Sequence, residues 1–233
     1  MNERRDWAPV DWSPMKRLIY LRGACKQGDG IELPPGYTRI EKISNPNSAY
    51  IDTGAALQYG SKITLCIETK AFPNANRMQY GWRWDGTYAN STQFYINSNY
   101  TTNRTDDLII AGVGAETTGV NDFIMGQKTI FVFDTGSNSI TVNNSDFNRN
   151  HVCRRGFNDS GSSVYAPYIL AINNKGTPAA VSHNTNVYYY KVEYNGAVIQ
   201  HMIPCISPNN EYGLYDVIRE QFFGSANGQR FDG

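Results

Sequence analysis

Acidic residues come first among those whose type and spacing could do chemistry. A glycoside hydrolase needs two carboxylates facing each other at about 5–10 Å, and on a strand this places them two or four residues apart. Glu68 has no such partner in its stretch, and Asp216 and Glu220 flank an expected turn. Asp106 and Asp107 are adjacent, so an extended chain would point them to opposite faces. Because Gly-x-Ser-x-Gly, Walker and dinucleotide motifs are also absent, the sequence does not predict an enzyme.

Oxygen ligands for calcium are the second candidate. Asn-Asp or Asp-Asp pairs at 106–107, 121–122 and 158–159 could supply them. However, Asn and Asp in turns usually bond to their own backbone, and the spacing matches no known calcium loop. We therefore expect no metal and no cofactor. Zinc is not expected either, because the histidines (His151, His183 and His201) and the cysteines are scattered, with no Cys-x-x-Cys pair. We expect the four cysteines to be unpaired, mostly buried thiols: Cys25, Cys66, Cys153 and Cys205.

Aromatic residues between 80 and 100 could stack on sugar rings. Period-2 geometry places Tyr80, Trp82 and Trp84 on one face of a strand, where three large rings more often form a layer of the core. The segment from 95 to 100 interleaves aromatic residues with Asn and Ser, as adaptable binding loops do. We therefore expect ligand contacts from the other tyrosines of this region and from one arginine: Arg83, Tyr88, Tyr95 and Tyr100.

Short strands separated by Gly, Asn, Asp and Ser turns must position these residues. The stretches 63–69, 128–133 and 139–142 are β-branched or aromatic runs of strand length, and the last two read as a hairpin. The clearest hairpin joins 187–194 to 197–203 through Asn195-Gly196, the preferred pair for a type I′ turn. A two-residue turn predicts a register in which Tyr194 faces Ala197, Val192 faces Ile199 and Tyr190 faces His201.

Composition supports an all-β domain. The chain has 233 residues with 21 Gly, 16 Tyr and 10 Phe, and only 18% of its residues are charged. Many short strands without interleaved helices predict a two-sheet β-sandwich. The formal net charge of +0 argues against non-specific binding to nucleic acid or anionic membranes. No stretch has the roughly 20 apolar residues that span a bilayer, and residues 1–7 do not open a secretory signal.

The first 35 residues read as an arm that precedes the domain. They end in Pro34-Pro35-Gly36, a rigid spacer followed by a turn, so we place the domain at 36–233. Exposed Trp and Arg are typical of interface anchors, so the arm could dock on a partner, or it could fold back onto its own domain. The anchoring candidates are Arg4, Arg5, Trp7 and Trp12.

Several motifs in the chain resemble one known family. Residues 37–43 and 49–54 resemble the opening of the concanavalin A-like (LamG-type) jelly-roll family, and the closing segments appear in that family's usual order. The resemblance covers roughly 37–233 and implies a concanavalin A-like jelly-roll β-sandwich with a short N-terminal extension. The closing segments are 168–176, 203–205, 212–216, 221–228 and 231–233.

This family is common in bacteriophage structural proteins and in proteins of gut bacteria. Together with the arm and the lack of an export signal, the resemblance implies a non-enzymatic virion protein, a fibre or decoration on capsid or tail, made in the host cytoplasm and displayed on the virion surface. Its arm would bind other virion proteins, and its jelly-roll would bind a cell-surface glycan. Because fibre-like appendages are usually symmetric, we expect a homotrimer. A bacterial carbohydrate-binding module is the alternative, and a glycoside hydrolase a poorer third.

Overall fold

The computed structural model describes most of the chain beyond residue 29. The chain divides into two units, residues 1–34 and 35–233, and everything below concerns the second. The described ranges are 30–70, 77–83, 93–99, 107–112, 114–121, 126–137, 139–143, 148–152, 165–179 and 181–233.

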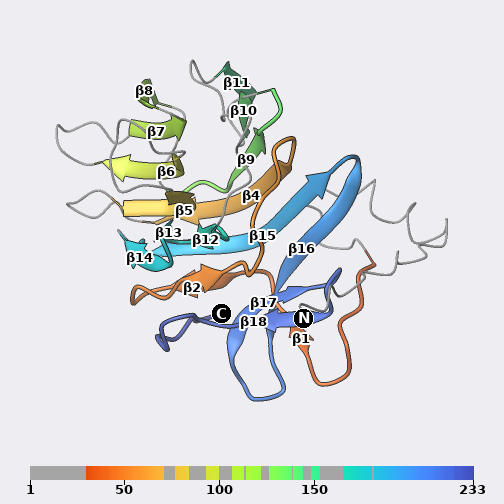
Figure 1. The fold of residues 1–233 in the computed structure, drawn as a ribbon. Helices are drawn as coiled ribbons and strands as arrows, with labels where there is room; N and C mark the ends of the chain where they lie inside the picture. Colours follow the sequence, from red (N-terminus) through yellow and green to blue (C-terminus); the bar gives the residue numbers. More distant parts are fainter. Residues whose placement is uncertain are drawn as a thin grey trace, which may run out of the picture. The chain divides into compact units, whose positions relative to one another are not determined.

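One sheet has ten strands, and every pairing within it is antiparallel (Figure 1). β1 adds to it beside β16, and β2 adds beside β15. The main path runs β11 (Asn148–Val152), β10 (Ser139–Asn143), β9 (Thr129–Asp134), β4 (Lys62–Thr69), β15 (Thr185–Tyr194), β16 (Ala197–Ile206), β17 (Tyr212–Asp216) and β18 (Gln221–Phe223), with β1 at Thr38–Arg39 and β2 at Ile43–Asn45.

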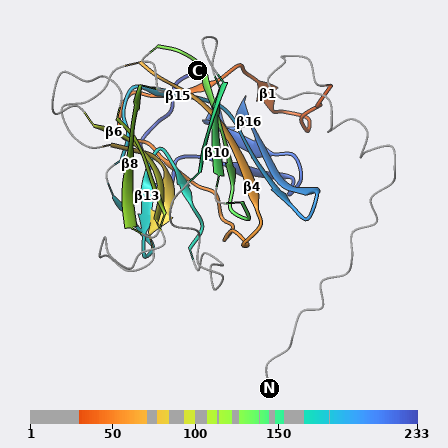
Figure 2. The same cartoon turned by 90° about the horizontal axis from the view of Figure 1, so that it is seen from above.

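The other sheet has eight strands. Its pairings are antiparallel except that β13 runs parallel to β5. The strands are β14 (Thr177–Ala179), β13 (Ile172–Asn174), β5 (Arg77–Arg83), β6 (Gln93–Asn99), β7 (Asp107–Gly112) and β8 (Gly114–Asn121), with β12 (Tyr168–Ile169) pairing with both β5 and β3 (Ile51–Asp52). Figure 2 shows β6, β8 and β13 in one layer beside β10, β4 and β16 of the other.

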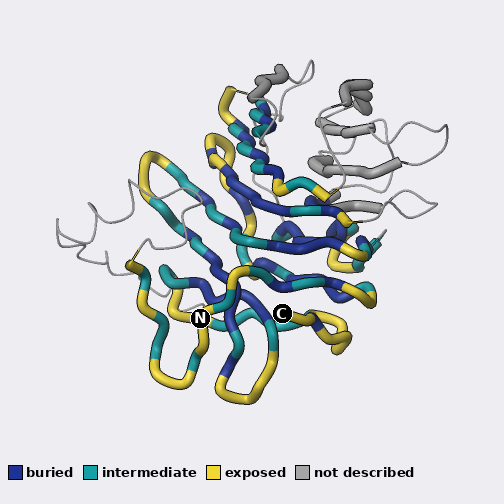
Figure 3. Tube along the Cα trace, turned by 180° about the vertical axis from the view of Figure 1, so that it is seen from behind, coloured by how far each residue is buried: buried dark blue, intermediate teal, exposed yellow. Residues whose placement is uncertain are grey.

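The core lies between the two sheets. Strand β9 alternates buried and half-buried residues, as a strand with one face on a core must. Tyr80 of β5 reaches across to the ten-stranded sheet, where its hydroxyl lies 3.0 Å from that of Tyr190 and its ring packs near Phe133. Figure 3 shows long buried stretches in the central strands and exposed residues at the turns between them.

These observations confirm the predicted all-β sandwich. No helix occurs in the residues that the structure describes, and hence none there that is long and apolar enough to cross a membrane. Strand β4 and the β9–β10 hairpin lie where the sequence predicted them. Tyr80 and Trp82 are buried, which confirms that these rings belong to the core, whereas Trp84 lies outside the described residues.

The β15–β16 hairpin confirms its turn and corrects its register. Asn195 and Gly196 have φ values of 50° and 74°, and Tyr194 faces Ala197 as predicted. A β-bulge follows directly: Glu193 faces Val198 and Val192 faces Gln200, so Ile199 is an extra residue on β16. The prediction that Val192 faces Ile199 and Tyr190 faces His201 was therefore wrong, because the turn fixes only the pairs before the bulge. Beyond it Tyr190 faces Met202, and both are buried.

Candidate functional site

A second β-bulge, in the middle of β15, presents two tyrosines on one face. Val187 faces Ile67 of β4, and the next pair is Tyr189 with Cys66, so Tyr188 is the extra residue. Val187 and Tyr190 are buried in the core, while Tyr188 and Tyr189 between them are half-buried. The bulge thus places both tyrosines on the outer face of the ten-stranded sheet, the face turned away from the core.

A row of polar side chains crosses this outer face beside the bulge. Asn186 of β15 lies opposite Ser44 of β2 on one side and opposite Glu68 of β4 on the other. Ser44 donates a hydrogen bond to Asn186 Oδ1 (2.8 Å), and Asn186 Nδ2 donates to Glu68 Oε2 (2.7 Å). The Tyr188 hydroxyl donates a second bond to the same carboxylate oxygen, at 2.6 Å. Two residues of β15 therefore bind the carboxylate of β4, and Ser44 of β2 holds one of them.

Lys128 completes the arrangement from the start of β9. Its ammonium lies 4.0 Å from the centre of the Tyr188 ring, a cation–π contact that contributes about 0.5–1 kcal/mol at an exposed site. Thr129 faces Ile67, so Lys128 stands next to Glu68 across the strand pair. We call Ser44, Glu68, Lys128, Asn186 and Tyr188 the Glu68 cluster.

The cluster holds both of its acidic groups in fixed protonation states. Burial alone would raise the pKa of Glu68, but the hydrogen bonds from Tyr188 and Asn186, with Lys70 and Lys42 nearby, bring it below its ordinary value. Burial and the neighbouring Glu68 carboxylate raise the pKa of Tyr188. At neutral pH Glu68 is thus ionised and Tyr188 protonated.

The cluster still has groups to offer a ligand. Glu68 Oε1 accepts no hydrogen bond from the described part of the chain, and Lys128 is exposed. One face of the Tyr188 ring carries the lysine, and Tyr189 lies beside it. The arrangement therefore combines an acceptor, a charged donor and aromatic surface, each fixed by contacts already made within the protein.

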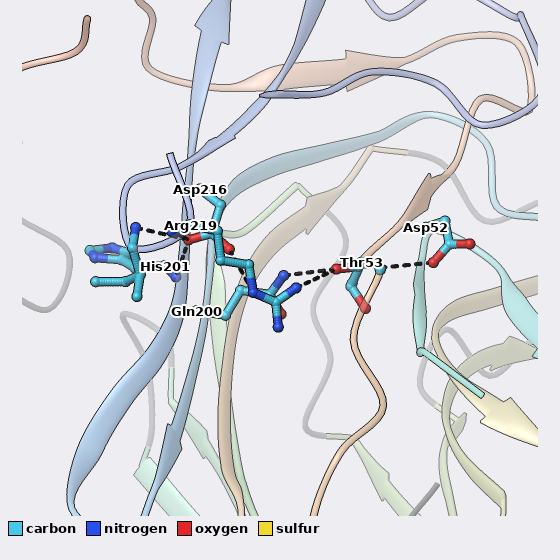
Figure 4. A network of polar contacts seen from close by, with 8 residues as sticks. Asp52, Thr53, Gln200, His201, Asp216 and Arg219 are labelled. Carbon is cyan, nitrogen blue, oxygen red and sulfur yellow. Dashed lines mark hydrogen bonds and ion pairs between the residues drawn. The ribbon is translucent and has the colours of Figure 1, made fainter. Parts of the chain in front are cut away.

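A second polar network lies inside the sandwich, around the fully buried Asp216 (Figure 4). Its Oδ1 accepts hydrogen bonds from the backbone N–H groups of His201 and Ile218, both at 3.0 Å, and of Arg219 at 3.4 Å. Its Oδ2 forms an ion pair with Arg219 Nε at 3.6 Å. The carboxylate thus closes the turn between β17 and β18.

The same network ties the two sheets together. Gln200 Nε2 on β16 donates to the carbonyl of Thr53 at 2.8 Å, and Arg219 Nη1 reaches the same carbonyl at 3.5 Å. Thr53 directly follows β3, and its hydroxyl donates to the carbonyl of Pro167 at 2.8 Å. These contacts fix the end of β3 against the ten-stranded sheet, so we assign this network a structural role.

Two of the residues predicted to bind a ligand, Arg83 and Tyr95, lie in strands of the other sheet. Arg83 ends β5 opposite Gln93, and Tyr95 lies in β6 opposite Gly81. The structure describes only the backbone at these two positions, so it does not bring their side chains together with any others. The remaining predicted site residues fall outside the described residues: Tyr88, Tyr100, Arg4, Arg5, Trp7 and Trp12.

The described residues bear on two further predictions. No group of three or more His, Cys, Asp or Glu side chains in them could hold a metal ion. Cys205 is a free, buried thiol whose pKa burial raises to about 12, and Cys66 is buried too. Cys25 and Cys153 lie outside the described part of the chain.

Reasoning from the sequence missed the Glu68 cluster. Glu68 has no second acid in its own strand, which argued against a catalytic pair. Its hydrogen-bond donors come instead from the neighbouring strand β15. One signal was present: Tyr188, Tyr189 and Tyr190 form a run that breaks the alternation of a regular strand. Such a break is typical of a bulge, and bulges often redirect side chains at functional sites.

Comparisons with known proteins give no family. No family model matches the chain, and no curated protein matches its sequence. Similar solved structures include the full extracellular region of zebrafish Gpr126/Adgrg6 (8% identity, 82% of this chain and 26% of that one, TM-score 0.45). Another is a putative carbohydrate binding protein from Bacteroides ovatus ATCC 8483 (12% identity, 84% of this chain and 60% of that one, TM-score 0.47). A third is described as NanB plus Optactamide (10% identity, 84% of this chain and 37% of that one, TM-score 0.42). The chain spans less than two thirds of each, and at these TM-scores its own contacts must carry the functional argument.

Proposed function

We propose that this chain is a non-enzymatic, lectin-like β-sandwich that binds carbohydrate through the Glu68 cluster. The observation that carries the proposal is the bulge at Tyr188, which sets two half-buried tyrosines beside a hydrogen-bonded carboxylate and an exposed lysine. A bulge in a central strand interrupts the ladder of backbone hydrogen bonds. A cluster built on that interruption is better explained by a ligand than by stability.

Sugars match what the cluster presents. A pyranose has an apolar face that packs on aromatic rings and a rim of hydroxyls that both donate and accept hydrogen bonds. The rings of Tyr188 and Tyr189 supply the first kind of contact. Glu68 Oε1 and the Lys128 ammonium supply an acceptor and a donor for the hydroxyls. Because the cluster is already ordered, binding a sugar would immobilise few additional side chains.

The virion role remains part of the proposal. The first described strand of the sandwich is β1, and the proposal treats residues 1–35 as an attachment element. We propose that the arm fixes the domain to the capsid or tail of a bacteriophage, as a homotrimer, and that the domain displays the Glu68 cluster toward host glycans. Removing residues 1–35 should abolish incorporation into particles while glycan binding persists. Unchanged incorporation would refute the anchor.

Deleting Tyr188 gives the sharpest test of the site. The deletion removes the extra residue, so Val187 and Tyr189 would pair with Ile67 and Cys66 in a regular register. The fold should survive, with cooperative urea unfolding, while binding on a glycan array should fall at least tenfold. Lys191→Gln is the matched control, because Lys191 lies in the same strand but pairs with Glu193 at 3.2 Å.

Two results would contradict the proposal. If the wild-type protein bound no glycan on the array, carbohydrate binding itself would be wrong. If the deletion variant folded and bound as well as the wild type, the sugar would have to bind elsewhere, and the sequence-based candidates Arg83, Tyr88, Tyr95 and Tyr100 would become the leading ones.

A further inference from the structure

The charges around the Glu68 cluster are distributed unevenly along its row. The row runs across four strands and the C-terminal segment, in the order Lys128, Glu68, Asn186, Ser44, Asp232, as the strand pairings and the Ser44–Asp232 bridge show. With neighbouring strands about 4.8 Å apart, the two ends of the row are roughly 20 Å apart. Lys128 and Asp232 therefore mark a positive and a negative end that act independently at physiological salt.

Two lysines gather at the positive end. Lys128 contacts the Tyr188 ring, and Lys70 stands two residues after Glu68, directly beyond the end of β4. Both are exposed. Lys42, which precedes β2, adds a third positive charge close enough to influence Glu68. Burial and the Glu68 carboxylate raise the pKa of Tyr188 most, and the Glu41 carboxylate adds to them.

One oxygen of the Glu68 carboxylate is already bonded within the protein. Its Oε2 receives the Tyr188 hydroxyl and the Asn186 amide, two charge-assisted hydrogen bonds of the strong kind. The ammonium groups of the lysines beside it can each give several hydrogen bonds, and that of Lys128 lies over the Tyr188 ring. The group best suited to this end of the row is an anion held close to an aromatic ring.

We infer that the saccharide bound by this site is acidic, with a carboxylate or sulfate at Lys128 and Lys70 and its ring against Tyr188 and Tyr189. The inference rests on the proposed function and deepens it. A simple anion would meet Glu68 between the two lysines and bind weakly. A ligand that also packs on the tyrosines gains contacts that offset this repulsion, so the site selects for a charged sugar rather than for charge alone.

A glycan array of acidic and neutral sugars tests the inference on the full-length protein. We expect the bound glycans to be uronic-acid or sulfated saccharides, and each to bind at least tenfold more weakly after methyl esterification or desulfation. Raising the salt concentration should weaken binding of the acidic form and leave the neutralised form unchanged. Poly-glutamate, an anion without a sugar ring, should not compete.

Lysine variants locate the effect. Lys128→Gln and Lys70→Gln should each reduce the preference for the acidic form over its neutralised form by at least threefold, and the double variant should abolish it. Lys175→Gln, on the exposed β13–β14 turn of the other sheet, and Lys191→Gln should leave the preference intact. Far-ultraviolet circular dichroism of each variant should match the wild type.

The possible failures can be told apart. If the array bound neutral glycans as tightly as acidic ones, the acidic ligand would be wrong while carbohydrate binding stood. If poly-glutamate competed fully, the lysines would form a general anion site, and the inference would again be wrong. If no glycan bound at all, the inference would fall together with the proposed function.

Discussion

Tyr188 and Glu68 share the shortest hydrogen bond of the cluster, and its energy should depend on pH. The pKa of Glu68 is lowered in the folded protein, so its contribution to stability is present above its ordinary pKa of 4.5 and is lost as pH falls through the folded value. Tyr188→Phe removes one donor and keeps the ring. We expect it to destabilise the protein by about 1 kcal/mol at pH 7, since the pair is half-exposed, and by less at pH 3.

Urea unfolding at the two pH values measures this difference. Tyr59→Phe is the control, because the Tyr59 hydroxyl donates to the carbonyl of Gly136 at 3.3 Å and involves no charge. Its effect should be small and the same at both pH values. An equal loss for Tyr188→Phe at pH 7 and pH 3 would mean that the hydrogen bond does not hold the ionised carboxylate.

Asp216 should matter far more than its exposed counterparts. Asp216→Asn keeps one acceptor for the three backbone N–H groups but removes the charge that pairs with Arg219. We expect a loss of about 2–3 kcal/mol in the free energy of unfolding, because a buried hydrogen-bonded charge is being removed. Asp52→Asn should change it by less than about 1 kcal/mol, since Asp52 Oδ1 accepts only the exposed N–H of Gly54. Similar losses for both would contradict the structural role of the buried charge on Asp216.

At the scale of the element, the β15–β16 hairpin depends on its two-residue turn. Gly196 has a φ of 74°, and no atom lies within 4 Å of where its Cβ would be, so the only penalty for a side chain is backbone strain. Gly196→Val should therefore destabilise the protein by about 1–3 kcal/mol, because β-branched residues resist positive φ. Lys191→Gln, in the same hairpin, should cost about 0.5 kcal/mol or less. Thermal unfolding compares them, and equal effects would contradict the turn's role.

Strand β15 also shows how bulges give one element two functions. Its regular parts bury Val187, Tyr190 and Val192 in the core, between β4 and β16. Its bulge turns Tyr188 outward and shifts the pairing with β4 by one residue, with regular pairing on both sides. The same strand therefore supplies the centre of the core and the centre of the candidate site.

At the scale of the whole molecule, the sandwich should fold without its arm. The described strands of both sheets lie within residues 36–233, and so do the described core residues, among them Tyr80, Tyr190 and Phe131. A protein of residues 36–233 should unfold in one cooperative transition with a midpoint within a few degrees of the full chain. Circular dichroism on heating measures it. An unfolded fragment would mean that the arm completes the core.

The sequence by itself determined the features that depend on near neighbours. Runs of β-branched and aromatic residues predicted β9 and its hairpin partner β10. The period of two placed Tyr80 and Trp82 on one face, and their large rings predicted that this face is the core. Asn195-Gly196 specified its turn because few other pairs accept positive φ at both positions. These patterns are local, since each is set by the chirality of the backbone and by residues only a few positions apart.

Only the tertiary structure decided the site. Glu68 lies 118 residues from Asn186 and 120 from Tyr188 in the sequence, and Ser44 lies 142 from Asn186. These residues meet because β2, β15 and β4 are neighbours in one sheet, and because a bulge adds one residue on one side of a pair. Strand order and bulges follow from how two sheets pack their side chains together. That packing is a property of the whole core, which no short stretch of sequence contains.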